Sequence, residues 1–188
     1  MIENSVWFRS TLYLVTSLMV AVWLIMLGVT MPHLEALTGG LKVFDMRPTG
    51  YSFEEAKAIL EGLGEAGRLY YANVQQGLDR VFPALIFLMV SGWQLLLARK
   101  FAMRGLRLPV WLVMLLLAIN LAGAIADYTE NSAVRAMLLV SPETITEGQV
   151  AGASAATIAK SILNSLSYLL LLAMAGFYFF RRRSPRGG

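Results

Sequence analysis

Hydrophobic residues along this chain gather into four long runs that are separated by more polar segments. The runs cover residues 11–31, 81–97, 108–126 and 158–180. A helix rises about 1.5 Å per residue, so about 20 residues cross a hydrocarbon layer of about 30 Å, and each run is close to that length. The pattern therefore predicts an all-α, integral membrane four-helix bundle, built as a single polytopic domain over residues 1–188.

The longest polar segment, residues 32–76, carries its own helix signals. Ser52 followed by Glu55 is typical of a capping box, in which a serine N-cap and a glutamate three residues later satisfy the first free amides of a helix. Apolar residues then recur at spacings of three and four as far as Leu63, and Gly64 is a typical helix end. We expect this short amphipathic helix to lie over the outer end of the bundle.

Helical patterning also continues beyond the apolar runs. A second helix is predicted to start at Glu65 and to run unbroken into the second span, where Pro83 should kink it or free a carbonyl group. The third span should extend to about Ser141, residues 142–154 should form a loop, and residues 41–44 a short extended run. The helical extensions and the amphipathic helix together make the predicted outer cap.

Charge is distributed unevenly between the two expected sides of the membrane. Nine of the sixteen basic residues, but one of the twelve acidic residues, fall in the two termini and the 99–107 link. By the positive-inside rule these parts are cytoplasmic, which predicts a multi-pass protein of the cell inner (plasma) membrane. The basic clusters then lie against the lipid bilayer, with anionic lipids as partners, and the high isoelectric point requires no nucleic acid.

Composition excludes several kinds of chemistry. The chain has no cysteine and one histidine, His33, so thiol chemistry, bis-histidine haem ligation and a histidine-rich metal site are all unsupported. His33 beside several carboxylates is a conceivable cation site, but no ligand spacing supports it. We predict no cofactor and no metal, and no catalytic residue can be named.

Three charged residues of different helices are predicted to share one depth. Asp79, Asp127 and Lys160 each lie 20 or 21 residues from the basic residue that ends its helix on the cytoplasmic side. At about 1.5 Å per residue, each is about 30 Å from that boundary. Asp127 and Lys160 are the pair that we expect to be in contact.

Helical spacing places further polar residues beside this layer. Asn120, Asp127 and Glu130 follow one stripe of the third span, and Lys160 and Asn164 follow one stripe of the fourth. Turning these stripes inward avoids placing charges against lipid, which is costly. The candidate ligand-binding residues are Asp79, Asp127, Glu130, Asn131, Lys160 and Asn164. Two alternatives remain open: charged residues at this depth can simply reach interfacial water, and the intramembrane asparagines can simply join helices by hydrogen bonds.

Three stretches of the chain support a resemblance to other proteins. The segment 44–56, with Phe44-Asp45-Met46-Arg47-Pro48, the segment 78–83 and the segment 127–131 resemble a family of small four-span bacterial membrane proteins with no assigned activity. Four spans, cytoplasmic termini and acidic residues inside the bundle are also distantly similar to the emopamil-binding and sterol isomerase superfamily, whose members bind lipophilic amines and sterols. No motif aligns with that superfamily and its pattern lacks the long outer segment, so no catalytic residue is transferred.

Three classes of function fit these features. The first is a bundle whose outer mouth binds an amphipathic, lipid-like molecule, with the polar head on the shared layer and the tail among the spans. The second is an accessory or assembly subunit, whose partners are other membrane protein subunits or further copies of the same chain. The third is an intramembrane enzyme that uses Asp127 or Glu130 as an acid or base.

Overall fold

The computed structural model describes the backbone of residues 3–183 and the side chains of residues 6–180, and this part of the chain contains helices and no strand. Four helical stretches are long and apolar enough to cross a membrane. The elements in order are α1 (Glu3–Ile25), the π-helical turn η1 (Met26–Thr30), α2 (Met31–Leu37), the 3₁₀ turn η2 (Phe44–Met46), α3 (Phe53–Tyr70), the π-helical turn η3 (Tyr71–Gln75), α4 (Gln76–Asp79), α5 (Phe82–Ala102), α6 (Val110–Leu138) and α7 (Glu147–Arg183).

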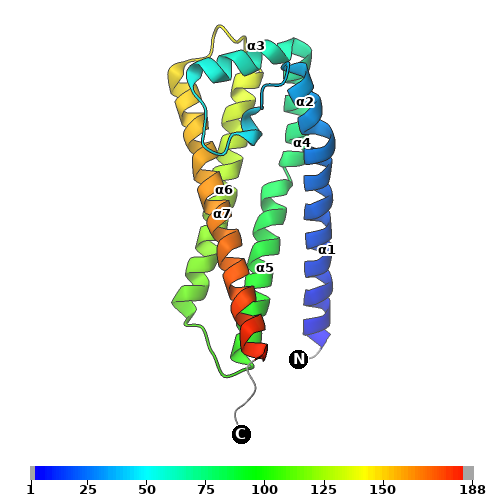
Figure 1. The fold of residues 1–188 in the computed structure, drawn as a ribbon, viewed down its shortest axis with the longest axis vertical. Coiled ribbons are helices and arrows are strands. Elements are labelled where there is room, and N and C mark those ends of the chain that lie inside the picture. Colours follow the sequence, from blue (N-terminus) through cyan, green and yellow to red (C-terminus); the bar gives the residue numbers. More distant parts are fainter. Residues whose placement is uncertain (1–2, 184–188) are drawn as a thin grey trace.

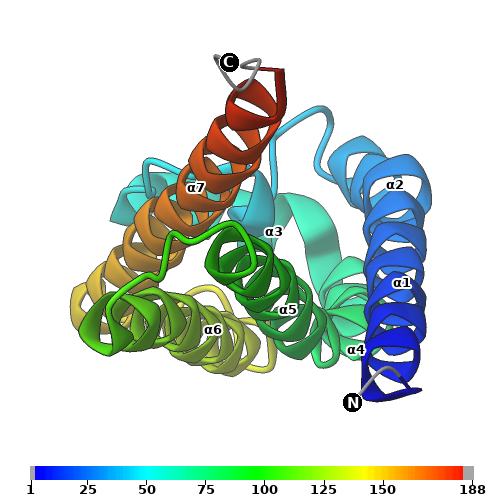
Figure 2. The ribbon, with the colours of Figure 1, turned by 90° about the horizontal axis from the view of Figure 1, so that it is seen from below.

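The long helices lie lengthwise beside one another, and α3 lies across one end of the bundle (Figure 1). The start of α1, the end of α7 and the link between α5 and α6 lie at the opposite end. Helix α5 packs against α1, α6 and α7, and α6 also packs along α7 (Figure 2). This arrangement confirms the predicted four-helix bundle with a helical cap. We call the end covered by α3 and residues 38–52 the capped end.

The cap has a hydrophobic core of its own. The capping box of Ser52 and Glu55 is formed, and Gly64 interrupts α3 with a φ of 59°. The apolar face of α3 packs against η2, η3 and the ends of α6 and α7, through buried residues that include Phe44, Ala56, Ile59, Leu60, Leu63, Tyr71, Val134, Met137, Val150 and Ala153. Burying this face holds the segment between the first two spans firmly on the bundle.

Helix α7 begins earlier than the sequence pattern predicts. Residues 147–154 were expected in a loop, but they form the first two turns of α7. Val150 and Ala153 are buried in the cap core, and Ser154 accepts a hydrogen bond at 2.9 Å from the backbone N–H of Tyr51. The small residues of this segment therefore allow close packing against the cap. Small residues are also common in loops, which is why the sequence pattern predicted a loop here.

The helical stretch that starts after Gly64 continues into the second span, as predicted, and it is interrupted just before Pro83, where a kink or a freed carbonyl group was expected. The chain passes through η3 and α4, turns at Arg80 and Val81, and restarts as α5 with Pro83 in the first turn. Proline has no N–H for the carbonyl group four residues earlier, which belongs to Asp79. The side chain of Asn131 donates to that carbonyl instead, at 3.4 Å.

Two smaller expectations at this end are corrected by the structure. The expected extended run 41–44 stops before Phe44: Val43 has an extended backbone, but Phe44 begins the turn η2 and is fully buried in the cap core. The first long helix continues beyond residue 31 through η1 and α2 to Leu37, so its capped end reaches α3.

A neutral polar cluster joins three helices in the middle of the bundle. The side-chain amide of Asn120 donates to Ser91 Oγ at 3.0 Å and to Gln94 Oε1 at 2.9 Å. Gln94 in turn donates to the backbone carbonyl of Ser167 at 3.4 Å. All four residues are buried, and we call them the inner amide cluster. Asn120 therefore has the interhelical role that was one of its two expected roles.

Candidate functional site: a charged cavity at the capped end

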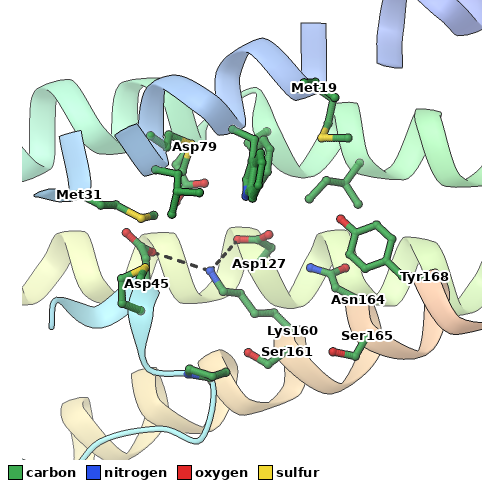
Figure 3. Close-up of a pocket in the computed structure, with 18 residues that line it drawn as sticks. Met19, Met31, Asp45, Asp79, Asp127, Lys160, Ser161, Asn164, Ser165 and Tyr168 are labelled. Carbon is green, nitrogen blue, oxygen red and sulfur yellow. Dashed lines mark hydrogen bonds and ion pairs between the residues drawn. The ribbon is translucent and has the colours of Figure 1, made fainter. Parts of the chain in front are cut away.

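A cavity of about 630 Å³ lies between α1, α7 and the capped end of α5. Met19, Val20, Trp23, Met26 and Leu27 of the first long helix form an apolar side of this cavity. The polar side chains that line it are Asp45, Asp79, Asp127, Lys160, Ser161, Asn164 and Ser165 (Figure 3). The cavity thus has an apolar side, formed by the first long helix, and a charged side that includes Lys160 and three aspartates.

Lys160 is the centre of the charged group. Its Nζ lies 3.3 Å from Asp127 Oδ1 and 3.8 Å from Asp45 Oδ1, and it forms a third ion pair with Glu130. The predicted contact between Asp127 and Lys160 is therefore confirmed. The side chains of Asp45, Asp127 and Glu130 are at most 6% exposed, so the lysine ammonium compensates charges that are removed from water.

Glu130 lies behind the lysine and does not line the cavity. Its side chain is fully buried, and its Oε1 accepts a hydrogen bond from Thr157 Oγ1 at 2.7 Å. It therefore links α6 to α7 and fixes the position of Lys160 from the protein side.

Asp45 was not among the predicted site residues, yet it completes the group. The turn η2 carries it from the cap into the bundle, where its Oδ2 accepts a hydrogen bond from Tyr71 Oη at 2.8 Å and one from Gln75 Nε2 at 3.5 Å. Gln75 accepts a hydrogen bond from Thr30, so the turns η1 and η3 are joined at the same place. The depth count could not find Asp45, because that count applies to helices that run through the membrane.

Tyr51 belongs to the same part of the cap. Its side chain is buried, and burial raises the pKa of its phenol, which therefore stays uncharged at neutral pH. A neutral phenol adds no further charge beside Asp45 and Glu130.

Asp79 differs from Asp45, Asp127 and Glu130 because, among the described residues, it forms no ion pair with Lys160. The residue is 2% exposed and lines the cavity, and among the residues whose side chains are described its Oδ2 has no hydrogen-bond partner. Figure 3 shows Asp79 on one side of the cavity and Lys160 on the other. Three carboxylates, Asp45, Asp79 and Asp127, therefore line a cavity that one ammonium group also lines, with Glu130 behind that ammonium, and no ion pair joins Asp79 to Lys160 in the described part of the chain.

Two further predicted residues have distinct positions. Asn164 lines the cavity, and it fits there because Gly123 faces it: a Cβ at Gly123 would lie 2.6 Å from Asn164 Oδ1. Asn131 does not line the cavity, because its amide binds the backbone of Asp79. Four of the six predicted site residues, namely Asp79, Asp127, Lys160 and Asn164, thus meet around one cavity.

Polar and apolar groups lie on different sides of the cavity. In the described part of the chain no three His, Asp or Glu side chains are placed to hold a metal ion, and the ring of His33 packs against Tyr70 at 4.6 Å between centroids. The cavity offers acceptor oxygens and negative charge on one side and apolar surface on the other. Such a site suits a ligand that carries hydrogen-bond donors at one end and hydrocarbon at the other.

Comparisons with protein-family models, curated proteins and solved structures found no match.

Proposed function

We propose that this chain is an integral membrane protein that binds an amphipathic molecule with a cationic head in the cavity at its capped end. The observation that carries this proposal is the uncompensated carboxylate of Asp79 in a cavity with apolar walls. A buried carboxylate with no partner is costly, and a ligand that donates to it recovers that cost.

The charge around the cavity selects the sign of the head group. Asp45, Asp127 and Glu130 already share Lys160, so an anionic head would meet the carboxylates with no free cation to compensate it. An ammonium group at Asp79 adds the missing positive charge and supplies N–H donors. The cavity volume of about 630 Å³ falls in the range of about 300–1,000 Å³ that is common for small-molecule sites.

Three ligands that share a dodecyl tail and differ in the charge of the head group test the proposed charge selectivity. Dodecylamine, dodecanol and dodecanoate are added separately to the purified protein in a neutral detergent at neutral pH, and thermal unfolding is followed by circular dichroism. We expect dodecylamine to raise the unfolding midpoint by roughly 5 °C or more, whereas dodecanoate leaves it unchanged. Equal shifts for all three would contradict a charge-selective site.

Two matched variants test whether Asp79 binds the head group of dodecylamine. Asp79→Asn keeps the shape of the side chain and removes its charge, so it should abolish the dodecylamine shift relative to the unliganded variant. Glu65→Gln makes the same chemical change at an exposed position of α3 and should retain the shift. A shift that survives in Asp79→Asn would remove Asp79 from the site.

The proposal includes an orientation in the membrane. The uncapped end carries Arg99, Lys100 and Arg104, and the guanidinium of Arg104 lies 3.9 Å from the ring centroid of Tyr178. We place this end in the cytoplasm, against anionic lipid headgroups. A reporter fused after Gly105 should report a cytoplasmic location, and one fused after Gly64 an external one; reversed signals would overturn the orientation.

One observation favours an accessory role as a second candidate. The ion pairs of Lys160 join α6, α7 and η2 without any ligand, as a structural lock would. A subunit of this kind should copurify with stoichiometric partner chains in mild detergent. Purification as one chain that still responds to dodecylamine would favour the binding function.

A further inference from the structure

The cavity has an open side, and that side faces outward between two helices. Helix α1 packs on α5, and α7 packs on α5 and α6, so α1 and α7 stand on the two sides of the cavity (Figure 2). The lining residues Val20 and Trp23 of α1 and Leu27 of η1 are 39%, 46% and 41% exposed, and on α7 the lining residue Ser165 is exposed. These exposed lining residues mark the opening, and Pro48 of the cap is a further exposed lining residue.

The capped end, in contrast, is held together by buried contacts beside the cavity. Thr30, Phe44 and Tyr71 are at most 2% exposed, and Tyr71 bonds to the lining residue Asp45. The turns η1 and η3 contact each other there, through the hydrogen bond from Thr30 to Gln75, and Tyr71 binds Asp45. A ligand that came from water at the capped end would have to break this buried network.

The rim of the opening has the chemistry of a surface that contacts lipid. Its α1 side is entirely apolar and lies in a helix with a mean hydropathy of 2.3 in its most apolar window. A mouth that opens to water normally carries a polar rim, because exposed apolar patches are costly in water and harmless in hydrocarbon.

We infer that the cavity takes its ligand sideways from the membrane leaflet at the capped end, through the opening between the first long helix, at Val20, Trp23 and Leu27, and Ser165 of α7. This inference rests on the proposed function. The occupant of the opening is the hydrocarbon chain of the cationic amphiphile, whose head reaches Asp79 while its tail remains between α1 and α7. The bilayer is thus the phase that supplies the ligand and receives it back.

A covalent bridge across the opening tests this route. The chain has no natural cysteine, so Val20→Cys and Ser165→Cys introduce two thiols in one step, and both residues line the opening. The double variant in lipid nanodiscs is treated with bis-maleimides of graded length, and the bridged product is separated from the rest. The probe is dodecylamine with a dansyl group at the far end of its chain, followed by energy transfer from tryptophan.

The bridge should slow both association and release of the probe by at least about tenfold, because exchange of a ligand through a narrowed path is limited by access. Protein that was loaded before bridging should retain its probe. The same double variant capped with a monofunctional maleimide is the matched control and should exchange at the rate measured before capping. Unchanged exchange in the bridged protein would overturn sideways entry.

A second variant keeps the test independent of the bridge. Trp23→Ala removes the largest side chain at the opening, so it should speed the association of the probe as well as its release, whereas a mere loss of contact with the ligand would speed release alone. Exchange at the unsubstituted rate would contradict the proposed opening. Loss of all probe binding in the unsubstituted protein would instead refute the proposed function, so the two failures can be told apart.

Discussion

Two polar regions lie inside this bundle, and they accommodate buried polar side chains between apolar helices in different ways. The inner amide cluster uses the neutral side chains of Asn120, Ser91 and Gln94, which bind one another between α5 and α6. The region at the capped end uses Asp45, Asp79, Asp127 and Lys160 around a cavity of about 630 Å³, with Glu130 paired to the lysine from behind. The first region is filled with protein, and the second encloses space.

The difference indicates which region serves structure and which serves recognition. Neutral amides hold helices together at low cost, because no charge has to be removed from water. The cost of burying a charged group is offset where the group is paired with an opposite charge, as Asp127 and Glu130 are with Lys160. Asp79 has no such pairing, so its position at the cavity is the feature that structure leaves unexplained.

The largest effect on stability should follow from removing the lysine. Lys160→Met leaves Asp45, Asp127 and Glu130 buried without their shared cation, and should lower the free energy of unfolding by about 3–5 kcal/mol. The measurement is reversible unfolding in mixed micelles, followed by circular dichroism.

The control for this change is Lys57→Met, which removes an exposed i,i+4 pair with Glu61 and should cost less than about 0.5 kcal/mol. Adding Glu130→Gln to Lys160→Met should recover part of the loss. Equal losses for the Lys57 and Lys160 variants would show that the charged region does not hold the helices.

A smaller loss is expected where the turn that carries Asp45 meets α7. Gly50 has a φ of 85°, and a Cβ there would lie 2.5 Å from Ser154 Oγ and 2.9 Å from Ile158 Cδ1. Gly50→Ala should therefore cost about 2–3 kcal/mol, through backbone strain and overpacking. Gly39 has a φ of 70° with open space around it, so Gly39→Ala should cost about 1–2 kcal/mol from strain. The same unfolding assay compares them, and an equal loss would mean that the turn is loosely packed.

The inner amide cluster should respond more weakly and without any effect on binding. Asn120→Leu removes the hydrogen bonds to Ser91 and Gln94, and should lower the free energy of unfolding by about 1 kcal/mol. The shift caused by dodecylamine should stay the same. A lost shift would show that the two regions are coupled.

The smallest expected effect on the free energy of unfolding is an increase. Asp79→Asn removes a buried charge that has no partner, and should raise the free energy of unfolding of the unliganded protein by up to about 1 kcal/mol. Asp127→Asn removes one of the partners of Lys160 and should lower it. If both variants lose stability equally, Asp79 has a structural role like that of Asp127.

Hydrophobic runs were sufficient to predict the bundle, because a membrane imposes one helix length on every span. The same reasoning placed Asp79, Asp127 and Lys160 at one depth, and the structure brings them around one cavity. It could not place Asp45, since a residue in a turn has no depth until the turn is packed. Packing of Phe44 in the cap core is what carries Asp45 to Lys160.

Local signals succeeded where a residue acts on its immediate neighbours. The capping box at Ser52 and the interruption at Gly64 are determined within a few residues and were predicted correctly. Residues 147–154 were assigned to a loop, because small and polar residues favour loops when nothing else is known. Their helix is stabilised by contacts with the cap, which lie more than ninety positions away in the chain, such as the bond from Tyr51 to Ser154.

The π-helical turns η1 and η3 have a consequence for how this chain tolerates changes in length. A π-helical turn holds one residue more than the α-helical turn that it replaces, and each residue of an α-helix rotates the following ones by about 100°. Because the wide turn absorbs its extra residue, the helix after Met26–Thr30 avoids that rotation, and Thr30 inside the turn donates to Gln75. The number of residues in each of these two turns therefore matters for the geometry of the site, as the identity of the residues does.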